Sequence, residues 1–158
     1  MKKLILVALK RNDRVEDFLP YVEEVVRPGM KAVFMVPYPV DGFRWSHEEI
    51  GRKAIEEAKR LANYYTWDTN LRKARERIAP VVKALSAKGI EVAVDLYAGS
   101  MRRALRDYEV KGDVHLIVTC ASVGNWIERL LDAAPSAFRS LIRPSFSPVM
   151  LINPRTLA

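Results

Sequence analysis

The sequence is poor in the residues that build covalent cross-links and metal centres. Its 158 residues include one cysteine, Cys120, and two histidines, His47 and His115. A single cysteine cannot form an internal disulfide, and the two histidines stand far apart without a metal-binding spacing. An internal disulfide is therefore excluded, and nothing in the sequence favours a metal site.

Long apolar runs are also missing. The longest span about five to eight residues, whereas a helix that crosses a bilayer needs roughly 20. Lys2-Lys3 followed by Leu4 to Leu9 has the look of a signal peptide, but Lys10-Arg11 closes the run and no small-residue cleavage site follows. The sequence therefore predicts a cytoplasmic protein that makes no use of a membrane.

Positive charge is in excess, with 26 basic against 19 acidic residues and a net charge of +7. The basic residues are interleaved with glutamates, which is typical of solvated helix surfaces. One stretch is different, because between residues 60 and 77 aromatic side chains alternate with basic ones and could stack single-stranded bases. No recognised nucleic-acid-binding motif accompanies it, so nucleic-acid binding is only a second alternative. The residues concerned are Arg60, Tyr64, Tyr65, Trp67, Arg72, Lys73, Arg75 and Arg77.

The chain length fits one domain, residues 1–158, with a substantial core. Short apolar, β-branched runs alternate along it with amphipathic segments, which predicts an α/β fold with a five-stranded parallel sheet and helices on both faces. The expected strands are Leu4–Leu9, Ala32–Val36, Ile90–Leu96, Val114–Val118 and Pro148–Ile152. The continuous apolar character of the fourth predicts a strand buried on both faces.

The helical segments carry recognisable start signals. Asp13 with Glu16, and Ser46 with Glu49, have the spacing of capping boxes. The second opens an extended helical region, about 46–87, which as one helix would run roughly 60 Å at 1.5 Å per residue. We expect a break or bend near residues 66–70, where cap-type residues replace helix formers.

A candidate ligand site lies beyond the carboxyl end of the fourth strand, where open parallel sheets bind ligands. In the strand order that the family resemblance described below implies, the end of the first strand adjoins it at the switch point. A cation at Lys10 or Arg11 would meet an anion that Ser122 and the N–H groups of Gly124 and Asn125 also bind. Alternatively, Ser122 or Asn125 merely caps the following helix. No catalytic constellation accompanies the site, and Cys120 is more typical of a buried apolar residue than of a reactive thiol. The candidate site residues are Lys10, Arg11, Asn12, Asp13, Thr119, Ser122, Gly124 and Asn125.

Three passages together resemble the universal stress protein family, within the adenine-nucleotide alpha-hydrolase-like folds. They are L-I-L-V-A-L at the start, G-S-M-R-R-A-L-R-D-Y followed by D-V-H-L-I-V, and the closing S-P-V-M-L-I-N. The resemblance implies strand order 3-2-1-4-5 and a homodimer built through the last strand, Val149, Met150, Leu151 and Ile152.

The sequence departs from that family where its members bind nucleotides. Their loop after the fourth strand carries G-x-x-G and, about nine residues later, G-[S/T], which lets backbone N–H groups approach phosphates. Here Cys120 and Val123 stand at the two glycine positions, and Ala133-Ala134 near the later pair. Lys10 replaces the aspartate that follows the first strand in the family. The resemblance therefore implies a non-enzymatic regulatory or stress-response homodimer with lost or altered ATP binding and no cofactor; the alternative is a domain that binds ATP or AMP through a non-standard loop.

Overall fold

The computed structural model describes residues 2–40, 66–120 and 147–153. The predictions made for Ser46, for the part 46–65 of the extended helical region and for the loop with Ser122, Gly124 and Asn125 lie outside these residues. The described strands are β1 (Leu4–Ala8), β2 (Lys31–Pro37), β3 (Glu91–Tyr97), β4 (Val114–Cys120) and β5 (Val149–Ile152). The described helices are α1 (Val15–Val25), α3 (Trp67–Ser86) and α4 (Met101–Lys111).

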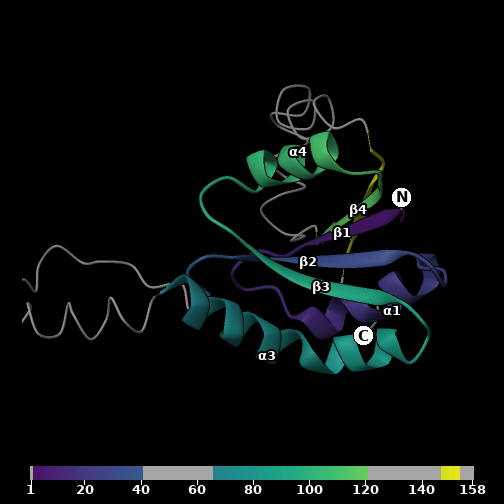
Figure 1. Cartoon of the computed structure of the whole chain (residues 1–158), viewed down its shortest axis with the longest axis horizontal. Helices are drawn as coiled ribbons and strands as arrows, with labels where there is room; N and C mark the ends of the chain where they lie inside the picture. Colours follow the sequence, from purple (N-terminus) through teal and green to yellow (C-terminus); the bar gives the residue numbers. More distant parts are fainter. Residues whose placement is uncertain (1, 41–65, 121–146, 154–158) are drawn as a thin grey trace, which may run out of the picture.

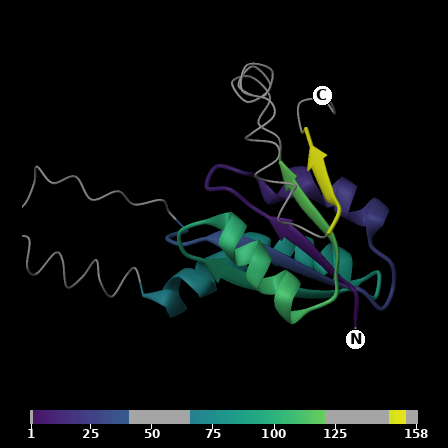
Figure 2. The ribbon, with the colours of Figure 1, turned by 90° about the horizontal axis from the view of Figure 1, so that it is seen from above.

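The strands of the described residues form one parallel sheet in the order β3-β2-β1-β4-β5. This confirms the predicted α/β fold and its 3-2-1-4-5 order. Helices α1 and α3 lie on one face of the sheet and α4 on the other (Figure 1). Strand β5 lies beyond β4 at the edge of the sheet (Figure 2). The strand order places the ends of β1 and β4 together and leaves β3 and β5 with one neighbour each.

Among the described residues, two apolar clusters hold the layers together, one on each face of the sheet. The larger packs alternate residues of the strands, such as Phe34, against Phe18 of α1 and Ile78 of α3. The smaller packs the intervening residues, such as Leu6 and Ile117, against α4. Because β1 contributes to both clusters, its side chains from position 5 to position 8 are fully buried. A continuous apolar run is what a strand covered on both faces requires.

Strand β4 is not fully buried as predicted, because its ladder with β1 contains an irregularity. Leu4 pairs with Val114 and Ile5 with Leu116, so His115 is an extra residue with no partner in β1. A bulge of this kind turns one residue out of the pleat. His115 is accordingly exposed, while Ile117 and Val118 are buried.

The helix starts follow the predictions only in part. The N-cap of α1 is Arg14 without a side-chain cap, so the capping box expected from Asp13 and Glu16 is wrong. Helix α3 begins at Trp67, inside the range where a new start was expected, and the Thr66 side chain accepts from the Thr69 N–H. A capped start here satisfies a backbone donor that the first helical turn leaves without an intrahelical partner.

The amino end of the sheet carries a charge cluster whose effect on stability we can predict. Glu91 lies 2.7 Å from Lys2 Nζ and 2.9 Å from Lys31 Nζ. Hydrogen bonds from Lys2 and then Lys31, with their charges, lower the pKa of Glu91 from 4.5 to about 2. A carboxyl whose pKa is lowered by folding stabilises the folded state fully at pH values above its pKa in the unfolded chain. This contribution is lost as the pH falls towards and through its pKa in the folded protein. Between pH 4.5 and 2, the free energy of unfolding should therefore fall more steeply in the wild type than in Glu91→Gln.

Urea titrations at half-unit pH steps in low salt measure this difference. Added salt should shrink it, since Glu91 and Lys2 are exposed and Lys31 is only partly buried. Equal pH slopes in the two proteins at low salt would show that the cluster contributes nothing.

Candidate functional site

The carboxyl ends of β1 and β4 lie side by side, as predicted. Ala8 pairs with Thr119, and the Thr119 hydroxyl donates to the Ala8 carbonyl over 3.3 Å. Two residues after the end of β1, Lys10 Nζ donates to the carbonyl oxygen of Cys120, the last residue of β4, over 2.8 Å. The ammonium group of Lys10 therefore ties together the two strand ends that form the predicted crevice.

The side chain of Asp13 closes the turn after β1. The Lys10 N–H donates to Asp13 Oδ2 over 2.8 Å, and the Asp13 N–H donates to the Lys10 carbonyl over 3.2 Å. The guanidinium of Arg77 in α3 donates to the Asp13 carbonyl. Asp13 thus shapes the turn instead of capping the helix, and this leaves Arg11 and Asn12 exposed at its tip.

Tyr97 is part of this region, although the sequence did not single it out. It is the last residue of β3, and its hydroxyl donates to the Leu9 carbonyl over 2.7 Å in a buried position. Burial, with the nearby charge of Asp13, raises its pKa to about 12, so the hydroxyl keeps its proton at neutral pH. Successive side chains of a strand point to opposite faces of the sheet. This alternation along β3 was the sequence signal that Tyr97 lies on the α4 side.

Cys120 behaves as a buried apolar residue. Its side chain is buried and forms no disulfide. Burial and the charge of Asp13 raise the pKa of the thiol, and the opposing effect of the Lys10 charge is smaller. A thiol that resists ionisation is a poor nucleophile. The geometry therefore favours packing for Cys120, as the sequence did.

The chemistry that these two strand ends offer is attraction of an anion. An ammonium group has three donors, and the bond to Cys120 occupies one of those on Lys10. The other predicted partners, Ser122, Gly124 and Asn125, lie outside the described residues. Among the residues that the structure describes, no three His, Cys, Asp or Glu side chains gather as a metal site would need. Within the same ranges, no helix is both long enough and apolar enough to cross a membrane.

The aromatic and basic segment is described from residue 66 onward. Trp67 is 46% exposed and lies against Tyr38, with ring centroids 5.3 Å apart. Arg72 pairs with Glu76 over 3.3 Å on the surface of α3. One ring contact and one ion pair within the chain therefore engage groups that the nucleic-acid alternative would use.

Solved structures with this architecture include universal stress proteins. The chain is 16% identical to universal stress protein UspA from Lactobacillus plantarum, over 95% of this chain and 97% of that one, with a TM-score of 0.55. It is 13% identical to a universal stress protein family protein from Arabidopsis thaliana with AMP bound, over 96% and 91%, with a TM-score of 0.55. It is 20% identical to a universal stress protein from Archaeoglobus fulgidus, over 96% and 94%, with a TM-score of 0.53.

At these identities the likeness is one of fold, and it agrees with the resemblance in the sequence. No protein-family model matches the chain, and no curated protein matches it significantly. The chain has the universal stress protein fold.

Proposed function

We propose that this chain is a cytoplasmic member of the universal stress protein family that acts in regulation or stress response by binding and not by catalysis. It works as a homodimer through β5, and adenine-nucleotide binding in its crevice is lost or altered. The observation that carries the proposal is the bond between Lys10 Nζ and the Cys120 carbonyl, at the point where the crevice would open. The resemblance places an aspartate at this position, so the charge here is reversed.

The reversal changes what the crevice can bind. A carboxylate accepts hydrogen bonds from a ligand, whereas an ammonium group only donates them. A ligand hydroxyl or amino group that needs an acceptor at this point meets a donor instead. The bond to Cys120 holds the Lys10 ammonium group at this point, so a ligand there meets the donors that the bond leaves over.

The alternative function, binding of ATP or AMP through a non-standard loop, has one observation in its favour. The positive charge of Lys10 at the ends of β1 and β4 attracts phosphate, and AMP is bound in the Arabidopsis protein of the same fold. In this alternative the phosphate would accept from the ammonium donors that the bond to the Cys120 carbonyl leaves over.

Calorimetric titration with ATP, ADP and AMP distinguishes the proposed function from the alternative. We expect any binding to be weaker than a dissociation constant of about 1 mM, which corresponds to only about 4 kcal/mol. Lys10→Met tests the role of the ammonium group, and Lys3→Met is its matched control, since Lys3 is exposed at the opposite end of β1. Micromolar binding that Lys10→Met abolishes and Lys3→Met preserves would establish the alternative and refute the proposal.

A further inference from the structure

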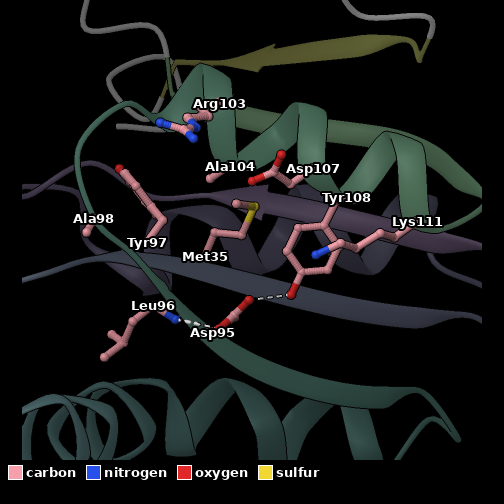
Figure 3. Close-up of a pocket in the computed structure, with 10 residues that line it drawn as sticks. All are labelled: Met35, Asp95, Leu96, Tyr97, Ala98, Arg103, Ala104, Asp107, Tyr108 and Lys111. Atoms are coloured by element: carbon pink, nitrogen blue, oxygen red, sulfur yellow. Dashed lines mark hydrogen bonds between the residues drawn. The ribbon is translucent and has the colours of Figure 1, made fainter.

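A cavity lies on the α4 side of the sheet, and it shares Tyr97 with the region around the turn after β1. Its volume is about 570 Å³, and it lies between β2, the end of β3 and one side of α4. This volume is within the usual range of about 300–1,000 Å³ for small-molecule sites. Figure 3 shows the lining residues: Met35, Asp95, Leu96, Tyr97, Ala98, Arg103, Ala104, Asp107, Tyr108 and Lys111.

The cavity has an apolar base and a charged rim. Met35 is 1% exposed and Tyr97 is 9% exposed, so both offer buried, mainly apolar surface. Arg103, Asp107 and Lys111 of α4 are exposed and lie in that order along the cavity (Figure 3). Their spacing of four residues puts them on one side of the helix, roughly 6 Å apart along its axis.

Opposite the rim, β3 contributes a carboxylate in a fixed position. Asp95 Oδ2 accepts from the Tyr108 hydroxyl over 2.5 Å, and Asp95 Oδ1 accepts from the Leu96 N–H over 2.9 Å. Burial, and then the bond to Asp95, raise the pKa of Tyr108, so this hydroxyl remains a donor at neutral pH. A carboxylate held by two donors needs little reorganisation to accept a third bond, since each oxygen accepts more than one.

The rim charges are available to a ligand. In the described ranges, neither a hydrogen bond nor an ion pair engages the side chain of Arg103, Asp107 or Lys111. The cavity therefore presents two cations and two carboxylates above an apolar base. Its formal charge is balanced, so neither a simple anion nor a simple cation satisfies it.

We propose that this cavity binds a small zwitterion of the amino acid class with an apolar side chain. The ligand ammonium lies between Asp95 and Asp107, and the ligand carboxylate meets the guanidinium of Arg103, whose geometry suits two parallel hydrogen bonds. The apolar side chain of the ligand covers Met35, Ala104 and the ring of Tyr97. A phosphate group is disfavoured, because it would have to lie beside two carboxylates.

Calorimetric titration of the full chain with L-phenylalanine and L-leucine tests the assignment. N-acetyl-L-phenylalanine lacks the ammonium and L-phenylalaninamide lacks the carboxylate, so each should bind at least about tenfold more weakly, as expected for losing a hydrogen bond to a charged group. The variants Arg103→Gln and Asp107→Asn should weaken binding of the intact amino acids by a similar factor. Arg102→Gln is the matched control, because Arg102 is exposed on the same helix but does not line the cavity.

Saturable binding with this dependence on both ligand ends and on both rim residues would support the assignment. No saturable binding of either amino acid up to about 10 mM would overturn it, because such a dissociation constant leaves less than about 3 kcal/mol for all the contacts. The assignment would also be overturned if L-phenylalaninamide or N-acetyl-L-phenylalanine bound as tightly as L-phenylalanine. The same holds if all variants bound the intact amino acids as tightly as the wild type. None of these results bears on nucleotide binding at the crevice, so the two proposals are tested separately.

Discussion

The Leu151→Pro protein is expected to be a monomer. Leu151 lies in β5, at the edge of the sheet, and is 41% exposed despite its apolar side chain. An apolar edge strand with open hydrogen-bonding groups readily pairs with a second chain, and a two-fold axis would let two copies of β5 pair with each other. Proline at this position removes one of the backbone donors that such pairing uses.

The register of β5 explains why this change should leave the fold of the monomer intact. Ile117 pairs with Val149, and the Ile117 N–H donates to the Pro148 carbonyl. In a parallel ladder alternate residues bond the same neighbour, so the N–H groups of Met150 and Ile152 face β4 and that of Leu151 faces the open edge. Proline at 151 therefore costs no bond to β4, and the preceding residue is already extended, as proline requires.

Light scattering coupled to size-exclusion chromatography measures the outcome. We expect a mass near the 18.0 kDa of one chain for Leu151→Pro, and twice that value for the wild type. Leu151→Val is the matched control, since it keeps the donor and the strand preference and should remain dimeric. A Leu151→Pro protein with unchanged circular dichroism that is still dimeric would refute the β5 interface.

Replacing Phe34 with alanine is expected to lower the free energy of unfolding by about 3–5 kcal/mol. Phe34 is fully buried in the larger cluster and lies in the middle of β2, between Val7 of β1 and Val94 of β3. Removing the ring leaves a cavity that the surrounding strands cannot fill without giving up their register. Since a domain of this size is stable by about 5–15 kcal/mol, the loss is a large fraction of the total.

Urea unfolding followed by circular dichroism at one fixed protein concentration measures this loss, because the stability of a dimer depends on concentration. The midpoint should fall while the slope with denaturant stays the same. Val110→Ala is the control, since Val110 is 82% exposed on α4 and its truncation should change stability by less than about 0.5 kcal/mol. A Phe34→Ala protein as stable as this control would mean that β2 does not pack as described.

The alternation of apolar runs and amphipathic segments predicted most of the fold. Runs such as Leu4–Leu9 and Ala32–Val36 need cover on both faces, so their pattern alone predicted strands with helices around them. The strand order came from the resemblance and not from the residues, since periodicity within a segment does not say which segments are neighbours. One local error arose where a side chain had two possible roles. Asp13 could cap a helix or close a turn, and it closes the turn by accepting from the Lys10 N–H.

The candidate site was predictable only as far as strand ends determine it. Lys10 and Thr119 belong to the same region because the parallel strands β1 and β4 end side by side, which the strand order implies. The bond from Lys10 to a carbonyl, and that from Tyr97 to Leu9, depend on side-chain conformation across strands that are distant in sequence. The cavity beside α4 also depends on residues that are distant in sequence. In the sequence alone, the charges of Arg103, Asp107 and Lys111 have the same pattern as any solvated helix surface, so they gave no signal of it.

The extra residue in β4 has a consequence for comparing this chain with others. Because Leu4 pairs with Val114 and Ile5 with Leu116, a chain without residue 115 would form a regular ladder and keep every later side chain on its present face. Position 115 is thus one at which relatives can differ in length without exchanging core for surface, in contrast to an ordinary position within a strand. A one-residue gap is physically acceptable there, although sequence alignments normally penalise gaps inside strands.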